Sequence, residues 1–352
     1  MTEKIKTEIK TNSPKAWFLA SRPKTLTAAA VPVLIGISFA VRKLHSFQVG
    51  IESGYVVPRD LLYTGQPKTV LDNGEGFSWL AALLCLLFAW VMQIDSNFIN
   101  DYYDNKKGAD NKHRLGPKRA CAEGWITMKA MKIGIVLTSL LGCAIGLPLI
   151  CYGGWEMVGV GFACLVFCFM YTTVFSYQGM GDLLVVVFFG IVPVACTYYV
   201  CMPKPLQMPG DEVFWASIAC GMAVDALLIL NNFRDRENDK RVDKRTLVVR
   251  IGARKSAKLY LYLGWVAAVI MSIINIVDFV ECKMCIPGFL LFGLYGYLHY
   301  QAYLKMIEIQ RGKKLNMVLG MTARNILVFG IISVITILMV MPFVQFPVVI
   351  YD

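Results

Sequence analysis

The sequence is poor in charged residues and nearly lacks histidine. Asp, Glu, Lys and Arg make up 17% of its 352 residues, whereas a soluble domain carries about 25%. Only three histidines occur, His45, His113 and His299. No set of Cys and His ligands accompanies the acidic stretches described below, which argues against a zinc or haem site. The low charge argues against a water-soluble domain.

Three further patterns are missing. There is no GxxxxGKS phosphate loop, so a P-loop nucleotide site is not expected. The apolar runs show no alternation of period two, which favours membrane helices over a β-barrel. Residues 1–16 are polar and rich in lysine, unlike the apolar segment of a secretory signal. We expect residues 1–16 to form a polar N-terminal tail.

What is present is hydrophobic: 57% of the residues are apolar and the mean hydropathy is +0.55. Runs of about 20 apolar residues, the length that crosses a bilayer, recur along the chain. The sequence predicts an all-α integral membrane protein with nine transmembrane helices in one domain over residues 17–345. The expected helices lie near 17–41, 78–100, 128–151, 156–176, 183–201, 212–232, 257–277, 286–305 and 318–342.

The basic residues indicate an orientation. With nine spans and a cytoplasmic N-terminus, 29 of the 35 Lys and Arg residues fall on the cytoplasmic side, as the positive-inside rule requires. The net charge of +11 then reflects contact with a lipid bilayer, and we expect no nucleic acid and no obligate protein partner. The C-terminus is predicted to lie outside.

The cysteines carry little information about function. Most of the eleven lie inside apolar runs, where cysteine behaves as a small hydrophobic residue. Cys282 and Cys285 form the only CxxC pair, and without a second pair or a nearby histidine we interpret it as incidental.

Two acidic stretches follow apolar runs, at 97–119 and 231–250. Residues three or four apart share a helix face, so Asn100 and Asp104 project together, as do Asp235 and Asp239. The two stretches resemble a parallel repeat, which would place both helix ends side by side on the cytoplasmic face. Asp and Asn oxygens suit Mg²⁺, which also takes water and substrate phosphates. The candidate metal ligands are Asn100, Asp104, Asp110, Asp235 and Asp239.

Together these features predict an Mg²⁺-bound diphosphate on a lipid-soluble substrate. A soluble diphosphate would not need nine spans. Departure of diphosphate from an allylic carbon leaves a cation, so the metal and nearby basic residues would stabilise the leaving group. Candidate catalytic residues are Asp101, Asp104, Asp235, Asp239 and Asp182; candidate substrate-binding residues are Arg22, Lys24, Asn97, Lys106, Lys118, Arg119, Tyr171, Tyr177, Lys244 and Arg245. Asp182 could instead cap a helix, and Asp225, buried in an apolar run, is left unassigned.

The motifs resemble the UbiA superfamily of intramembrane prenyltransferases, which carries NDxxDxxxD and DxxxD. The last Asp of the first motif would fall at Gly108, and Asp110 comes two residues later. This spacing is similar to the 1,4-dihydroxy-2-naphthoate polyprenyltransferase branch. The matching segments are RPKTL at 22–26, NDYYDNKKGAD at 100–110, RLGPKRA at 114–120, GWIT at 124–127, GDLLVVVFFG at 181–190, NNFRD at 231–235 and KRTLVVRIG at 244–252.

The resemblance implies a UbiA-like fold in a bacterial cytoplasmic membrane. It also implies Mg²⁺-dependent transfer from polyprenyl diphosphate to 1,4-dihydroxy-2-naphthoate, with loss of CO₂, to give demethylmenaquinone in menaquinone biosynthesis. Two alternatives stay open. One is a related enzyme acting on another aromatic acceptor, such as 4-hydroxybenzoate. The other is an ion-coupled transporter, although transporters hold their acidic residues near the bilayer midplane rather than at helix ends.

Overall fold

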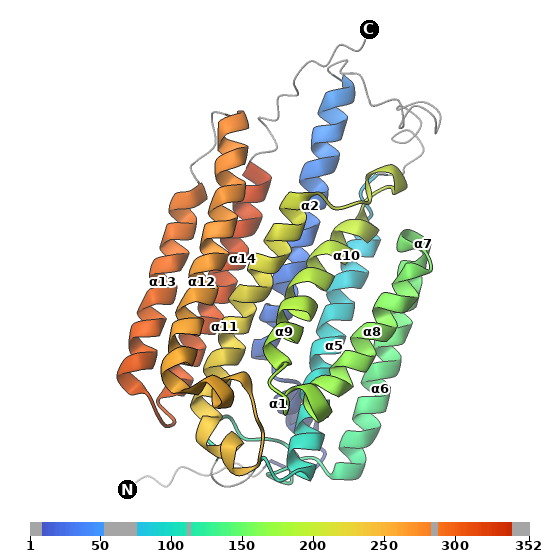
Figure 1. The fold of residues 1–352 in the computed structure, drawn as a ribbon. Coiled ribbons are helices and arrows are strands. Elements are labelled where there is room, and N and C mark those ends of the chain that lie inside the picture. Colours follow the sequence, from blue (N-terminus) through green and yellow to red (C-terminus); the bar gives the residue numbers. More distant parts are fainter. Residues whose placement is uncertain (1–8, 53–75, 111–113, 283–287, 340–352) are drawn as a thin grey trace, which may run out of the picture.

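The computed structural model describes residues 9–52, 76–110, 114–282 and 288–339, and these residues form helices without any strand. Long helices run roughly parallel or antiparallel to one another in one bundle (Figure 1). Helices satisfy their own backbone hydrogen bonds, which lipid cannot do. Leu, Val, Ile, Phe and Trp side chains on their outer faces are exposed, as a membrane-facing surface requires.

The first half of the chain begins with a short helix that breaks at Arg22, where φ is +51°. Side-chain oxygens of Ser13, Ser78 and Thr127 cap three helix starts by accepting backbone N–H bonds, which fixes where these helices begin. In order the elements are α1 (Pro14–Ser21), η1 (Pro23–Thr25), α2 (Leu26–Glu52), α5 (Trp79–Lys106), α6 (Met128–Gly146), η2 (Leu147–Leu149), α7 (Ile150–Gly153), α8 (Glu156–Met170) and the π-helical turn η3 (Tyr171–Phe175).

The second half is built around α11, the most buried of the apolar spans. It packs against α12, α14 and the α9–η4 segment. Gly252, with φ of +78°, separates the first turn of α12 from its long part. The elements are α9 (Gly181–Val186), the π-helical turn η4 (Val187–Ile191), α10 (Val192–Cys201), η5 (Lys204–Leu206), α11 (Asp211–Arg241), α12 (Leu247–Cys282), α13 (Gly288–Ile309) and α14 (Leu315–Met339).

The prediction of an all-helical membrane protein is confirmed, and the count of nine spans is close. Eight segments in the described part of the chain are long and apolar enough to cross a membrane. The remaining predicted span, 286–305, corresponds to α13, which packs against α12 and α14. The helices α5 and α11 run several residues past the predicted ends at 100 and 232, so both acidic stretches begin as helix. Cys285 and residues 340–345 lie outside the described residues.

Close backbone packing joins α11 to the segment α9–η4. A Cβ on Gly221 would lie 2.6 Å from the carbonyl oxygen of Val186, and a Cβ on Gly190 would lie 2.4 Å from that of Ser217. Only glycine permits this approach, because any side chain would meet backbone atoms that cannot move aside. The contact fixes the height of α9 relative to α11.

We therefore expect Gly221→Ala to lower thermal stability in detergent, because overpacking typically costs about 1–3 kcal/mol. Gly293→Ala in α13 is the matched control, since nothing lies within 4 Å of a Cβ there. The measurement is the unfolding temperature of both purified variants. Equal unfolding temperatures would show that the α9–α11 contact is not tight.

Candidate functional site

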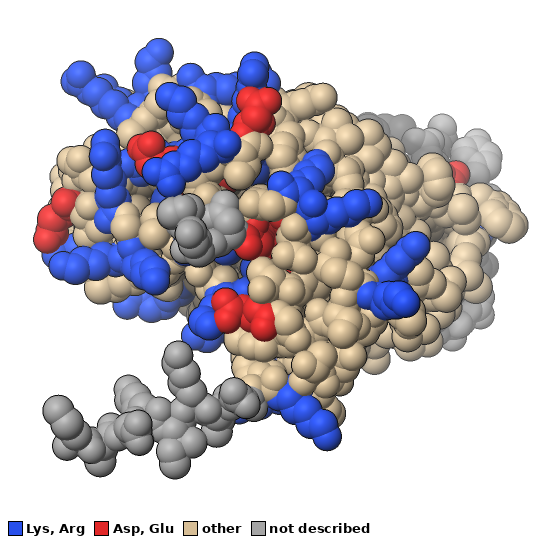
Figure 2. Space-filling model, turned by 90° about the horizontal axis from the view of Figure 1, so that it is seen from below, with Lys and Arg blue, Asp and Glu red and all other residues tan. Residues whose placement is uncertain are grey.

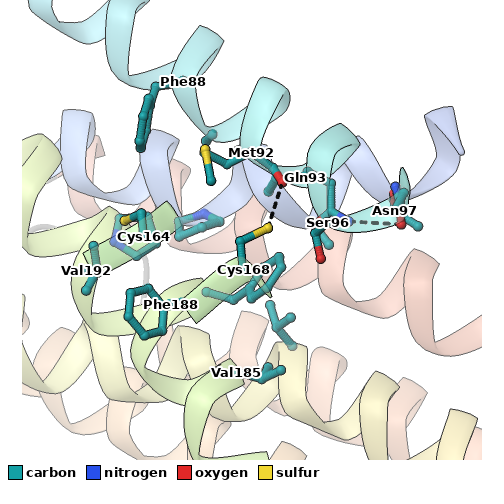
Figure 3. Close-up of a pocket in the computed structure, with 18 of the residues that line it drawn as sticks. Phe88, Met92, Gln93, Ser96, Asn97, Cys164, Cys168, Val185, Phe188 and Val192 are labelled. Carbon is teal, nitrogen blue, oxygen red and sulfur yellow. Dashed lines mark hydrogen bonds between the residues drawn. The ribbon is translucent and has the colours of Figure 1, made fainter. Parts of the chain in front are cut away.

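A large apolar cavity runs between α2, α5, α6, α8 and the α9–α10 segment, with a volume of about 920 Å³. Its walls are mainly aliphatic, aromatic and sulfur-containing side chains. Figure 3 shows Phe88 and Met92 from α5 opposite Cys164 and Cys168 from α8, with Phe188 on a third side. Towards the ends of α5 and α11 the wall becomes polar, with Arg22, Lys24, Asn97, Asn100, Arg114, Arg119, Asn231, Arg234 and Asn316.

A second, smaller chamber of about 110 Å³ lies next to this polar end. Its lining is mostly polar and includes Asp104, Asp182, Asn232 and Lys244. The two cavities share the residues Arg22, Asn100, Arg119, Tyr171, Leu228 and Asn231. A charged pocket therefore adjoins a long apolar one.

The first acidic stretch lies on the last turns of α5. Asn100 accepts a hydrogen bond of 2.7 Å from the Thr172 hydroxyl and lines both cavities. Asp104 is 3% exposed; its carboxylate oxygens lie 3.7 Å from Arg119 Nη2 and 3.8 Å from Lys244 Nζ. The Oδ1 atom of Asp104 has no hydrogen-bond partner in the described structure. It is therefore free to accept one from a ligand.

Asp101 occupies a different position, although it is adjacent in sequence. Its two carboxylate oxygens accept the backbone N–H groups of Ala120 and Cys121 at 3.0 and 2.9 Å. Arg22 Nη2 approaches it at 4.0 Å. In the structure Asp101 lines neither cavity among the described residues and instead holds the segment that carries Arg119 against α5.

Asp110 follows a turn in which Gly108 has φ of +72°. Its buried side chain pairs with Arg114 and lies 3.6 Å from Arg119 Nε. Burial raises the pKa of Asp110 to about 7; the positive charge of Arg114 opposes the rise, and the negative charge of Asp104 adds to it. Its Oδ2 atom has no hydrogen-bond partner among the described residues, which leaves an oxygen available to a cation.

The second acidic stretch lies on the end of α11, and there Asp235 pairs with its neighbour Arg234. The Nε atom of Arg234 donates to Asp235 Oδ1 at 2.9 Å, and its Nη2 atom contacts Oδ2. Arg234 also donates to Asn231 at 2.7 Å and to Asn316 of α14 at 2.8 Å. This buried arginine lines the large cavity and ties the motif to α14.

The two acidic stretches meet in the structure. The side-chain amide of Asn238 donates to the backbone oxygen of Ala109 at 3.1 Å. Lys244 of the second stretch approaches Asp104 of the first. Asp239 is buried beside Lys244, whose backbone N–H it accepts at 2.8 Å through its carbonyl oxygen. The ends of α5 and α11 therefore meet, but of the acidic residues in the two stretches only Asp104 is among the described residues that line a cavity.

Arg22 and Asn97 form the joint between the N-terminal helices and α5. Asn97 donates to the Ser21 carbonyl and the Thr25 hydroxyl, each at 3.0 Å, and accepts from Arg22 Nη1 at 3.3 Å. The left-handed backbone of Arg22 turns its side chain into the shared wall of the two cavities. Its Nη2 atom makes no hydrogen bond among the described residues.

Aromatic residues lie beside the chamber, in the π-helical turn η3 and just after it. Single π-helical turns are common at functional sites. Tyr171 lines both cavities, and Asp182 lines the chamber. The ring of Tyr177 lies between two lysines, with Lys107 Nζ at 3.7 Å and Lys244 Nζ at 5.4 Å from its centroid. Burial and nearby carboxylates raise the pKa of Tyr177 above its ordinary value, so its hydroxyl stays protonated.

Some predicted residues lie apart from both cavities. Lys106 is exposed, Lys118 pairs with Glu123, and Arg245 pairs with Asp243. None of these three cations is among the described residues that line a cavity.

Other residues reach the site without having been predicted, notably Arg114, Asn231, Asn232, Arg234 and Asn316. Arg234 and Asn231 stand inside the second motif, where their position next to Asp235 could have identified them. For Asn316 the sequence offers no signal, because it reaches the site from α14, 82 positions away from Arg234.

The chain is similar in sequence to proteins of one family. The profile of the UbiA prenyltransferase family matches residues 64–319. A 1,4-dihydroxy-2-naphthoate octaprenyltransferase of Haemophilus influenzae is 32% identical over 263 residues, covering 72% of this chain and 75% of the relative. The enzyme of the same name from Escherichia coli is 30% identical over 279 residues, covering 77% and 79%.

A solved structure has the same fold. It is a UbiA homologue from Archaeoglobus fulgidus bound to DMAPP and Mg²⁺, with a TM-score of 0.56. The match covers 90% of this chain and 98% of that one at 13% identity.

The different surroundings of Asp101 and Asp104 predict different effects of substitution. Asp101→Ala leaves two buried backbone N–H groups unpaired, at about 1–3 kcal/mol for each group, and we expect a clear drop in unfolding temperature. Asp104→Ala removes no side-chain hydrogen bond among the described residues, so its unfolding temperature should fall much less. Thermal unfolding of both variants in detergent without substrate measures the difference; a reversed order would contradict these assignments.

Proposed function

Because the chain belongs to the UbiA prenyltransferase family, we propose that it transfers a polyprenyl group from polyprenyl diphosphate to 1,4-dihydroxy-2-naphthoate. The reaction releases CO₂ and diphosphate and gives demethylmenaquinol, the reduced form of demethylmenaquinone, for menaquinone biosynthesis. The observation that carries the proposal is the charged chamber adjoining a 920 Å³ apolar cavity. Relatives named for this reaction align over three quarters of their length.

The two cavities match the two halves of a polyprenyl diphosphate. A diphosphate head needs cations, and the shared wall supplies Arg22 and Arg119, with Lys244 in the chamber. A polyprenyl tail needs an apolar channel, which the walls of α5, α8 and α10 provide. We assign the head to the chamber and the tail to the large cavity, with the breaking C–O bond where the two adjoin.

The chamber suits Mg²⁺ by the chemistry of its oxygens. Asp104 lines the chamber, and Asp110 lies outside its lining but close to the same arginine, Arg119. Asp104 Oδ1 and Asp110 Oδ2 are buried without hydrogen bonds in the described structure. No group of three or more His, Cys, Asp and Glu residues forms a metal cluster within the described ranges, but Mg²⁺ typically takes only one or two protein carboxylates besides phosphate and water. The residues that would hold it are Asn100, Asp104, Asp110, Asp235 and Asp239. Bound there, Mg²⁺ would neutralise charge on the leaving diphosphate.

The protein's own groups complete the ionisation step. Arg22, Arg119 and Lys244 add positive charge where the C–O bonding electrons move onto diphosphate. Tyr171 presents an aromatic ring at the junction, where it can stabilise the allylic cation. The apolar wall excludes water, which would otherwise capture that cation.

We further propose that the chamber faces the cytoplasm of a bacterial cell, with the protein in the cytoplasmic membrane. The end of the bundle that holds the chamber carries most of the Lys and Arg side chains, and Figure 2 shows them spread around a few acidic residues. Cytoplasmic ends of membrane proteins carry this excess, and the soluble naphthoate acceptor would reach the chamber from that side.

Product identity tests the acceptor. Purified enzyme with 1,4-dihydroxy-2-naphthoate, Mg²⁺ and a polyprenyl diphosphate should yield demethylmenaquinol, which mass analysis detects as such or as demethylmenaquinone after oxidation by air, and 4-hydroxybenzoate should yield no prenylated product. If 4-hydroxybenzoate gave the prenylated product and the naphthoate did not, 4-hydroxybenzoate would replace the naphthoate as the proposed acceptor. The same masses give the preferred prenyl length.

Two substitutions test the acidic stretches. We expect Asp104→Ala and Asp235→Asn to lower kcat at least about 100-fold, in the range seen when an electrostatic stabiliser of a leaving group is removed. Asparagine at 235 keeps an acceptor for Arg234, so the fold is preserved. Insertion and elution profile of each variant are the controls. Turnover near that of the wild type in either variant would exclude that residue from the reaction.

Metal removal is the third test. A chelator should abolish product formation, and Mg²⁺ should restore it, because the diphosphate leaves poorly without the cation. The measurement is the initial rate during titration of Mg²⁺ into chelator-treated enzyme. Unchanged turnover in chelator would remove the metal from the proposal.

A further inference from the structure

Two buried carboxyl groups lie on adjoining helices near the chamber. Asp182 on α9 lines the chamber, and Asp225 lies on α11, which packs against α9. Their exposed fractions are 6% and 3%. The Oδ1 atom of each lacks a hydrogen-bond partner, and no Lys or Arg forms an ion pair with either one within the described ranges.

The glycine contact between the helices fixes this pair. Gly221 meets the backbone at Val186; Asp182 is one turn before Val186, and Asp225 is one turn after Gly221. Since the two helices run in opposite directions (Figure 1), the carboxyl groups are brought to the same height. Asp182 is thereby held at the chamber wall.

Asp182 differs from the other carboxylates of the site. Among the described residues that line the two cavities, only Asp104 and Asp182 carry carboxyl groups. Asp104 has two cations within 4 Å. Asp182 has no such partner within the described ranges, and its buried Oδ1 atom has no hydrogen-bond partner there, so this oxygen is available to accept a proton from a ligand in the chamber.

We propose that Asp182 is the base that takes the proton of the acceptor's ring hydroxyl, and that Asp225, at the same height on α11, is the positioning residue behind it. This inference rests on the proposed function. It assigns the acceptor to the chamber side of Tyr171, with its hydroxyl towards Asp182 and its attacked carbon towards the apolar cavity.

The steps balance in electrons and protons. The allylic C–O bond breaks and its electrons leave with diphosphate. The ring carbon that bears the carboxylate bonds to the allylic carbon, the neighbouring hydroxyl becomes a carbonyl, and its proton passes to Asp182. The resulting β-keto carboxylate loses CO₂, and the electrons of the broken C–C bond restore the aromatic ring. The ring oxygen then recovers the proton from Asp182.

Steady-state kinetics and binding separate this role from the metal cluster. We expect Asp182→Asn to lower kcat about 100-fold or more, the usual range for general acid–base groups. Binding of a non-reactive thiolo-diphosphate prenyl analogue with Mg²⁺ should be unchanged, which also shows that the variant is folded. Asp182→Glu, which keeps a carboxylate, should recover part of the loss. Asp225→Asn should lower kcat about tenfold with both KM values unchanged.

Asp95→Asn is the matched control. Asp95 is a buried carboxyl group of α5 that accepts hydrogen bonds from the hydroxyls of Thr138 and Ser139, and it lines neither cavity among the described residues. The variant should turn over like the wild type. A kcat near the wild-type value in Asp182→Asn would show that Asp182 is not the base. Loss of analogue binding in that variant would overturn this role too, by placing Asp182 in the diphosphate site. Wild-type kcat and KM values in Asp225→Asn would show that Asp225 does not position Asp182. If the wild-type enzyme made no product from the naphthoate, the proposed function itself would be wrong.

Discussion

The site depends on holding two helix ends together although both carry negative charge. The ends of α5 and α11 bring the carboxylates of Asp104, Asp235 and Asp239 into one buried region, where like charges repel strongly. Arg119, Arg234 and Lys244 reduce that repulsion, and the bond from Asn238 to Ala109 fixes the spacing. The same balance leaves Asp104 Oδ1 and Asp110 Oδ2 free of hydrogen bonds in the described structure, so the site is stable yet still able to bind a cation.

Much of the fold could be predicted because helix formation in a membrane depends on residues that are close together in the sequence. Apolar runs of bilayer length predict helices, since lipid allows little else, and the helix ranges differ from the structure mainly where polar residues continue a helix beyond the apolar run, as at the ends of α5 and α11. The spacing of Asn100 with Asp104 and of Asp235 with Asp239 correctly predicts shared faces.

Contacts between distant segments could not be predicted. Asp101 resembles its neighbour Asp104 in sequence, but only the fold shows that it accepts two backbone N–H bonds. The pairing of Asp235 with Arg234 is local, yet the bond from Arg234 to Asn316 requires the placement of α14. Likewise, the proposed role of Asp225 behind Asp182 depends on the close glycine contact between α11 and the α9–η4 segment, which the sequence does not reveal. Residue type and spacing predict a helix face; they do not predict what packs against it.

The link between Arg234 and α14 also affects how the protein is made. Asn316 accepts from Arg234 and donates to the carbonyl of Leu115 at 3.0 Å, so the first residues of α14 join both acidic stretches. During synthesis α5 and α11 emerge from the ribosome well before α14. Until α14 inserts, Arg234 and the segment after residue 114 lack this shared partner. The end of the bundle that holds the chamber is therefore completed late in biogenesis. A chain that ends before α14 would insert its earlier helices but would lack the contacts of Asn316 that join the two acidic stretches.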